Sequence, residues 1–157
     1  MYDDILLPTD GSDAAEAAVD HAVRLARAFD ATVHVLSVVE PIPAVEMDAA
    51  MVHERLRESA QMAADRACER LDAAGVPHES SVRDGSAHRS ILAAADEAGA
   101  DLIVMGTHGR TGVGRVLLGS VTERVVRGAD APVMAVRYHP EDEEAEAEMA
   151  TESEGGE

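Results

Sequence analysis

The sequence contains no lysine, no tryptophan and a single cysteine, and its only aromatic residues are two tyrosines and one phenylalanine. Because Cys68 has no second cysteine to pair with, an intrachain disulfide is excluded, and a reducing compartment suits the chain. The core must be built from alanine and aliphatic side chains, which allow helices to lie close to a sheet. No apolar stretch approaches the ~20 residues of a membrane span, and Asp3 and Asp4 precede the first apolar run. We therefore expect a cytoplasmic protein without membrane contact.

Basic residues are also scarce. The chain has 13 basic residues, all of them arginine, and 31 acidic residues, which gives a formal net charge of −18 at pH 7. Such a surface repels nucleic acid and anionic membranes, because both are bound largely through basic groups, so we expect neither as a partner. An acidic surface without lysine resembles that of proteins from salt-accumulating organisms, in which salt screens the self-repulsion. We therefore hypothesise a halophilic source.

Two kinds of segment alternate along the first 137 residues. Short apolar or β-branched runs predict strands at 5–7, 32–39, 79–83, 102–105 and 133–136, the third of them polar enough for a sheet edge. Helical patterns begin after Ser12 or Asp13, at about 47, near 86 and at 120, and the last three end at Gly75, Gly99 and Gly128. Strict strand–helix alternation predicts a parallel sheet with helices on both faces. We expect one α/β domain over residues 1–137 with a single open, five-stranded parallel sheet.

The last stretch, residues 138–157, has a different composition. It contains nine acidic residues and no basic one. Low hydrophobicity and charge of one sign favour a disordered segment. We expect a solvated acidic tail rather than a docking motif.

A glycine-rich loop follows the predicted strand 102–105. Gly106 and Gly109 are followed after nine residues by Gly119 and Ser120, where the last helix begins. Glycines permit positive φ angles and let backbone N–H groups approach a ligand, while the first amides of a helix attract phosphate. The pattern predicts a phosphate-binding loop. The alternative is that the glycines serve only as turn residues.

The sequence gives little sign of catalytic or metal chemistry of its own. His108 lies in the loop without an identifiable partner, and the seven histidines lack the spacing of a zinc site. Arg110 and Arg115 are equally suited to a phosphate and to surface or dimer contacts. We therefore expect no catalytic residue and no protein-borne metal site.

The motif Gly106-x2-Gly109-x9-Gly119-Ser120 resembles the signature of the ATP-binding universal stress proteins. Residues 5–12 (ILLPTDGS) are similar to that family's first strand and turn, and residues 131–136 (APVMAV) to its last strand. The resemblance covers about residues 2–137. It implies a Rossmann-like sheet of strand order 3-2-1-4-5, with the ligand where the order reverses. The turn at 84–86 departs from the family pattern, but it is not the phosphate loop.

The same resemblance implies how a nucleotide is held. Asp10, with Thr9 beside it, would bind the ribose hydroxyls, and the backbone of Val38 would contact the adenine edge. Mg²⁺ or Mn²⁺ would bridge the phosphates. The residues that would hold those phosphates are Gly106, Gly109, Gly119, Ser120 and Val121. From the residues alone, Asp10 could serve only as a turn or capping residue, and the side chain of Val38 is a core residue.

We therefore expect a homodimeric, ATP-binding regulatory protein with slow or no hydrolysis. Val133, Met134 and Val136 of the last strand would pair two chains edge to edge. Nucleotide binding would order the loop 107–118 and so present a different surface to an unidentified regulatory protein. Two alternatives stay open. One is a slow ATPase or phosphotransferase that uses Asp10 or His108, and the other is a dimeric scaffold that binds no nucleotide.

Overall fold

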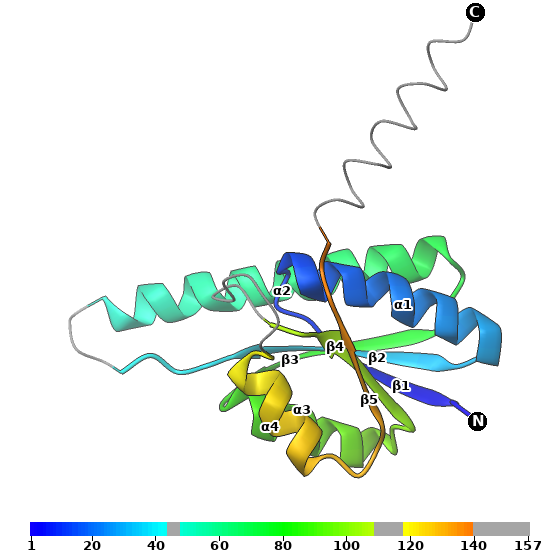
Figure 1. The fold of residues 1–157 in the computed structure, drawn as a ribbon. Coiled ribbons are helices and arrows are strands. Elements are labelled where there is room, and N and C mark those ends of the chain that lie inside the picture. The colour runs from blue at the N-terminus through cyan, green and yellow to red at the C-terminus, as the bar shows by residue number, and fades with distance from the viewer. Residues whose placement is uncertain (44–47, 109–117, 140–157) are drawn as a thin grey trace, which may run out of the picture.

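The computed structural model describes residues 1–43, 48–108 and 118–139. Five strands form one parallel sheet in the order β3-β2-β1-β4-β5, flanked by helices on both sides (Figure 1). The strands are β1 (Asp4–Pro8), β2 (Thr32–Val39), β3 (His78–Asp84), β4 (Leu102–Gly106) and β5 (Val133–Val136). The helices are α1 (Asp13–Phe29), α2 (Ala49–Ala73), α3 (Ala87–Ala98) and α4 (Ser120–Gly128). The predicted α/β class and strand order are confirmed.

Each face of the sheet carries its own hydrophobic core. In Figure 1, α1 and α2 lie above the sheet, and α3 and α4 lie below it. Ile5 and Leu7 of β1 belong to the core under α1 and α2, whereas Leu6 belongs to the core against α3 and α4. Successive side chains of a strand point to opposite faces, so a central strand covered on both sides reads as an unbroken apolar run. That is why residues 5–7 show no polar alternation.

Alanines bring α1 close to the sheet. The buried face of this helix consists of Val19 and five alanines, namely Ala14, Ala15, Ala18, Ala22 and Ala26. The helix begins at the Ser12 cap, whose Oγ accepts the N–H of Ala15 at 3.3 Å. Small side chains permit a short distance between helix and sheet, as the aromatic-poor composition predicts. This close approach determines the geometry around the end of β4, described below.

The two edges of the sheet differ in polarity. β3 forms one edge and exposes Glu79, Ser80 and Ser81. β5 forms the other edge, where Val133 and Met134 are half-buried and Ala135 is exposed. Polar and charged side chains disfavour pairing of an edge strand with another chain. The β5 edge is therefore the more suitable of the two for pairing.

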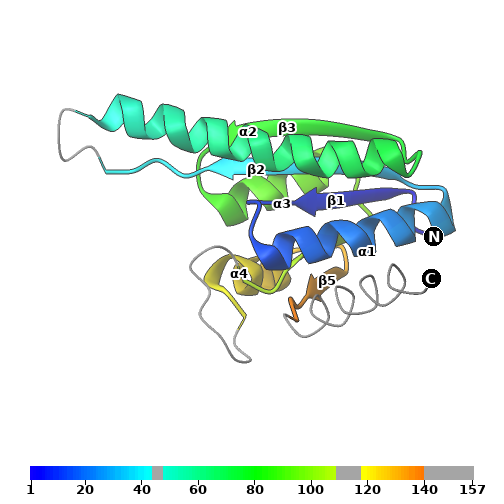
Figure 2. The same cartoon turned by 90° about the horizontal axis from the view of Figure 1, so that it is seen from above.

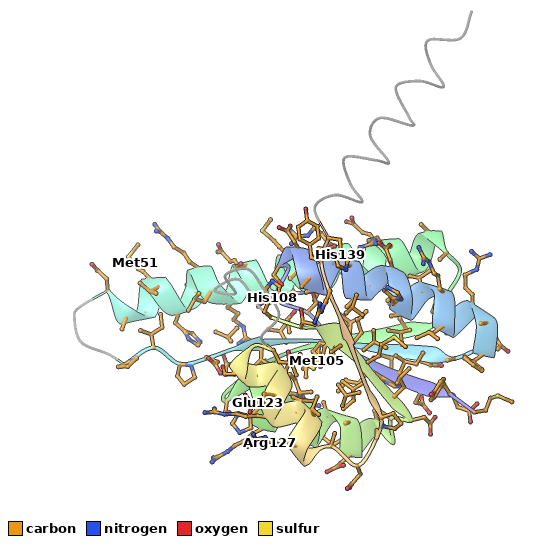
Figure 3. All side chains as sticks on the ribbon, in the orientation of Figure 1. Met51, Met105, His108, Glu123, Arg127 and His139 are labelled. Atoms are coloured by element: carbon orange, nitrogen blue, oxygen red, sulfur yellow. The ribbon has the colours of Figure 1, made fainter. Side chains whose placement is uncertain are left out.

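The N-terminal half of α2 extends beyond the sheet. Figure 1 shows it projecting past the end of β2, and Figure 2, turned by 90°, agrees. Met51, labelled in Figure 3, is exposed near the tip, as are Val52 and Leu56. Asp84, at the end of β3, binds this part of the helix through Arg57 at 2.7 Å and His53 at 3.2 Å. Across the described ranges, no helix combines the length and the apolar composition that crossing a membrane requires.

Asp101 ties the loop before β4 to the start of β1. Its Oδ2 accepts the N–H of Asp3 at 2.8 Å and of Asp4 at 3.0 Å. These backbone hydrogen bonds lower the pKa of the Asp101 carboxyl from the usual value of 3.8. A lowered pKa in the folded state contributes stability above pH 3.8, and this contribution is lost as the pH falls through the folded-state pKa.

We therefore expect Asp101→Asn to lower the denaturation midpoint at neutral pH, where the carboxylate is charged. The difference from the unmodified chain should shrink as the pH falls below about 4 and vanish once it is below the folded-state pKa, where both proteins carry a neutral side chain at this position. Urea unfolding measured from pH 7 down to pH 3 checks this expectation. A difference that stays constant across the series would contradict it.

The division between a domain at 1–137 and a tail at 138–157 stays a prediction. Tyr138 and His139 follow β5, and residues 140–157 lie outside the described residues.

Candidate functional site

The candidate site lies at the carboxyl ends of β1 and β4, the neighbouring strands between which the strand order reverses. In open α/β sheets, ligands bind in the crevice at such a point. The buried polar side chains of the described residues are Thr9, Ser37, Thr107 and Thr122. All four make or flank the turns at this end of the sheet. Polar side chains thus gather in one place within otherwise apolar surroundings.

The turn after β1 is fixed by its own hydrogen bonds. The N–H of Thr9 donates to the carbonyl of Leu36 at 2.9 Å, and the Ser37 hydroxyl donates to the carbonyl of Thr9 at 2.7 Å. Asp10 is exposed, and its Oδ1 accepts the N–H of Ser12 at 2.9 Å. Asp10 is therefore a turn residue, as one of the two interpretations predicts. Asp10 is exposed at the carboxyl end of β1, on a backbone that the neighbouring strand β2 holds in place.

The backbone of Val38 points toward this turn. In β2, the carbonyl of Leu36 accepts from Thr9, on the β1 side. The N–H of Val33 and the carbonyl of Val39 bond to the β3 side. Because backbone groups alternate in direction along a strand, those of Val38 point to the β1 side, like those of Leu36. β1 ends at Pro8, opposite Leu36, so Val38 lies level with the turn that follows. The side chain of Val38 packs against the lower core, as expected for a core residue.

The positive φ angle predicted for Gly106 is wrong. Of the glycines described, those with positive φ are Gly11, Gly75, Gly85 and Gly99, so Gly106 does not use the left-handed region. A Cβ on Gly106 would lie 2.8 Å from the backbone carbon of Ala14 and 2.9 Å from the N of Ala15. The first turn of α1 therefore occupies the space that a side chain would need. Close packing of α1 on β4, rather than turn geometry, requires this glycine.

The ends of the glycine loop are held together. The N–H of Gly119 donates to the carbonyl of Thr107 at 2.7 Å, and the Thr122 hydroxyl donates to the carbonyl of Gly106 at 2.8 Å. Gly119 has a φ of −61°, and a Cβ there would lie 3.1 Å from the Cα of His108. This glycine too permits close approach rather than a left-handed turn. Gly109 falls within 109–117, outside the described residues.

The first turn of α4 differs from those of α1 and α3 in how its amides are satisfied. Ser12 caps α1, and the Glu40 carboxylate accepts the N–H of Ala87 at the start of α3, at 3.0 Å. α4 starts after Gly119, which offers no side-chain cap, and Glu123 of its first turn pairs with Arg127 at 2.8 Å. Ser120 is exposed and Val121 is half-buried. The amides at the start of α4 are thus suited to an anionic ligand at the point where the strand order reverses.

His108 shows no acid–base pairing in the described part of the chain. Its Nδ1 lies 3.0 Å from Oγ1 of the adjacent Thr107. Figure 3 shows it where the chain leaves β4, close to α4. The described contacts give it neither a carboxylate partner nor a nucleophile, so they add no support for the catalytic alternative.

The comparison with protein families decides the assignment. The model of the universal stress protein family matches residues 1–137. The chain belongs to this family. A universal stress protein of Methanocaldococcus jannaschii is 39% identical over 141 residues, which cover 87% of this chain and 83% of that protein.

Solved structures of universal stress proteins share the fold. One, of a second M. jannaschii universal stress protein, has a TM-score of 0.79 at 33% identity and covers 88% of this chain and 98% of that one. Another, a universal stress protein in complex with cAMP, has a TM-score of 0.66 at 28% identity. That match covers 88% of this chain and 99% of the other.

Sequence reasoning missed two residues of the candidate site, Ser37 and Thr122. Both donate a buried hydroxyl to a backbone carbonyl at a strand end. In each case the sequence periodicity contained a signal that could have identified the residue. Ser37 continues the inward-facing series Val33 and Val35 at a spacing of two residues, and Thr122 lies three residues before the buried Val125. A polar residue at a position that periodicity marks as buried indicates a specific hydrogen bond.

Proposed function

We propose that this universal stress protein is a regulatory protein that binds ATP where the strand order reverses, with slow or no hydrolysis. The observation that carries the proposal is the start of α4. Within the described residues its first amides have no side-chain cap, and they lie beside the end of β4, at the same end of the sheet as the Asp10 turn. A helix N-terminus favours phosphate, and a carboxylate is a natural acceptor for ribose hydroxyls. The similarity to a universal stress protein that binds cAMP supports a nucleotide as the ligand.

In this proposal the ligand lies across the turns that follow β1 and β4. Asp10 accepts hydrogen bonds from the ribose, with Thr9 shaping the turn beneath it, and the Val38 backbone contacts the adenine edge. The phosphates lie at the glycine loop. The groups proposed to hold them are the backbone amides of Gly106, Gly109, Gly119, Ser120 and Val121, with the Ser120 hydroxyl.

A divalent cation, Mg²⁺ or Mn²⁺, is proposed to accompany the phosphates. The described residues contain no cluster of three side chains arranged to ligate a metal. The cation would therefore be held mainly by phosphate oxygens and water, which is the usual arrangement for Mg²⁺ with nucleotides. It would reduce the repulsion between a polyphosphate and a chain of net charge −18.

Titration calorimetry with Mg-ATP tests the proposal, and Asp10 provides the sharpest variant. We expect Asp10→Ala to weaken ATP binding by about 10- to 100-fold, because a hydrogen bond to a charged group contributes roughly 1.5–3 kcal/mol. The same variant should bind ATP and the analogue lacking both ribose hydroxyls equally, whereas the unmodified chain should prefer ATP. Asp130→Ala is the matched control and should bind as the unmodified chain does, because Asp130 is an exposed carboxylate just before β5, at the opposite end of the strands.

Each alternative has its own signature in these measurements. Turnover well below ~1 s⁻¹, the lower end of ordinary enzymes, is expected of a regulatory protein. Faster hydrolysis would favour the ATPase or phosphotransferase. Absence of any heat with Mg-ATP would favour the scaffold that binds no nucleotide.

We also propose that two chains pair through β5 and that the dimer acts in the cytoplasm on an unidentified regulatory protein. The carbonyls of Pro132 and Val136 accept from Ile103 of β4 and from Thr107 just after it. By alternation, the peptide groups of Val133 and Ala135 therefore point to the open edge. Val136 itself is buried in its own chain's core. Its side chain therefore stabilises the monomer and is not available to a partner, and pairing would rely on the backbone with Val133 and Met134 alongside.

Ala135→Pro tests the dimer. Proline removes the outward N–H of residue 135, and the bonds of its neighbours to β4 remain. We expect light scattering to give the mass of one 16.5 kDa chain for the variant and twice that mass for the unmodified protein. Ala135→Val, which keeps the N–H and suits a strand, should remain dimeric. An unchanged mass for Ala135→Pro would exclude this interface.

A further inference from the structure

We propose that two buried hydroxyls, those of Ser37 and Thr122, are positioning residues that set the two halves of the site independently. This inference rests on the proposed nucleotide binding. Thr122 would position the amides for the phosphates, and Ser37 would position the groups for the nucleoside. Neither side chain would touch the ligand, because Ser37 and Thr122 are only 1% and 2% exposed.

Thr122 connects the first turn of α4 to the end of β4. Its hydroxyl donates to the carbonyl of Gly106, the last residue of β4, at 2.8 Å. The N–H of Gly119 provides a second link, to the carbonyl of the following residue, Thr107, at 2.7 Å. Two hydrogen bonds from one helical turn to two successive carbonyls fix the direction of the helix start. The amides of Ser120 and Val121 lie between these links, so their orientation depends on both.

Ser37 connects β2 to the turn that carries Asp10. Its hydroxyl donates to the carbonyl of Thr9 at 2.7 Å, and Thr9 returns a bond from its N–H to the carbonyl of Leu36 at 2.9 Å. Residue 37 directly precedes Val38, and residue 9 directly precedes Asp10. One side chain therefore fixes the spacing between the backbone proposed to contact adenine and the carboxylate proposed to contact ribose. Neither Ser37 nor Thr9 lies in the phosphate loop.

The two linkages are separate in the structure. Ser37 follows Val33 and Val35 on the face of the sheet under α1 and α2, and Thr122 belongs to α4 on the opposite face. They share no hydrogen-bond partner among the described contacts. A carbonyl that loses a buried donor is left without its partner, and the backbone then shifts to find another. Removal of each hydroxyl should therefore disturb one half of the ligand and leave the other half in place.

Calorimetry of the full chain with Mg-ATP and, separately, with adenosine tests the division. Thr122→Val removes the hydroxyl at similar volume and should weaken ATP binding by about tenfold while changing adenosine binding less than about twofold. Ser37→Ala should weaken both ligands by about the same factor, so that the ratio of their affinities stays unchanged. Thr122→Ser restores the hydroxyl and should restore ATP affinity. Ser81→Ala, an exposed hydroxyl on β3, is the control and should change neither ligand.

Several results would overturn the inference. Equal weakening of ATP and adenosine by Thr122→Val, a changed ratio with Ser37→Ala, or no recovery with Thr122→Ser would each contradict the assignment of one hydroxyl to each half of the ligand. Melting temperatures are measured on every variant, and Thr122→Ala replaces Thr122→Val if the latter does not fold. Failure of the unmodified chain to bind either ligand would refute the proposed function itself. If instead the unmodified chain binds both ligands but the variants do not affect them as expected, only the roles proposed for Ser37 and Thr122 are refuted.

Discussion

Gly106→Ala is expected to lower the free energy of unfolding by about 3 kcal/mol, the upper end of the cost of overpacking a core. For a chain of this size that corresponds to a fall in melting temperature of roughly 6–12 °C. The added Cβ would lie 2.8–2.9 Å from the backbone of Ala14 and Ala15. Backbone atoms in the first turn of α1 can move away only if the whole helix shifts on the sheet. Denaturant unfolding of the variant measures the loss.

Gly128→Ala is the matched control. A Cβ at Gly128 would also approach a neighbour to 2.8 Å, but that neighbour is Cδ1 of Leu92, the end of a flexible side chain. Gly128 is the last residue of α4, where alanine has the better helix propensity by up to ~1 kcal/mol. We expect this variant to be as stable as the unmodified chain or more so. If Gly106→Ala proves equally harmless, the packing explanation for the motif glycine is wrong.

The packing of α1 against Gly106 also affects how binding experiments on Gly106 variants are interpreted. Loss of nucleotide binding in a Gly106 variant would follow from displacement of α1, which carries the Asp10 turn at its start. Such a loss would not demonstrate a contact between Gly106 and phosphate. Thr122→Val and Asp10→Ala are more specific, because neither places an atom in space that α1 occupies.

The second large effect concerns salt. We expect the melting temperature to rise by roughly 4–8 °C between 0.1 M and 2 M KCl, which corresponds to about 2 kcal/mol for a chain of this size. The 31 acidic residues exceed the 13 arginines, so self-repulsion opposes folding at low salt. Salt also weakens exposed pairs such as Arg83–Glu97, yet each of these contributes only about 0–1 kcal/mol. Screening of the repulsion is therefore the larger effect.

A charge-reduced variant distinguishes repulsion from other effects of salt. Glu54, Glu58 and Glu69 are exposed on α2 and make no ion pair among the described contacts. Their joint replacement with glutamine should raise the melting temperature at low salt and flatten its dependence on KCl. A variant with an unchanged slope would show that KCl acts through something other than these charges. A melting temperature that does not rise with KCl would remove the hypothesis of a halophilic source.

The order of the elements was predictable because it depends on local signals. Apolar runs, glycine stops and the Ser12 cap are legible within short windows, and alternation of strand and helix then restricts the sheet to parallel pairing. The third strand was the weakest prediction, since its polar pattern reflects an edge position. The strand order came from the family resemblance rather than from periodicity.

Which residues of the candidate site come together was predictable, but the contacts between them were not. The Asp10 turn and the start of α4 do lie at the same end of the sheet, as the motif indicated. The reason for Gly106 was not predictable, because the atoms that exclude a side chain belong to Ala14 and Ala15, more than ninety positions earlier in the chain. The hydrogen bonds of Ser37 and Thr122 also join distant segments, and periodicity marks such residues only as exceptions to an apolar pattern.

The unequal edges of the sheet limit how copies of this chain can assemble. β3 presents Glu79, Ser80 and Ser81, whereas β5 is short and largely apolar. A sheet in which both edge strands can pair could add copies without end and grow into a fibre. A sheet in which only one edge strand can pair forms a dimer, in which that strand pairs with the same strand of a second copy across a two-fold axis. Edge pairing in this protein would therefore stop at two subunits, because the polar β3 edge disfavours the addition of a further copy.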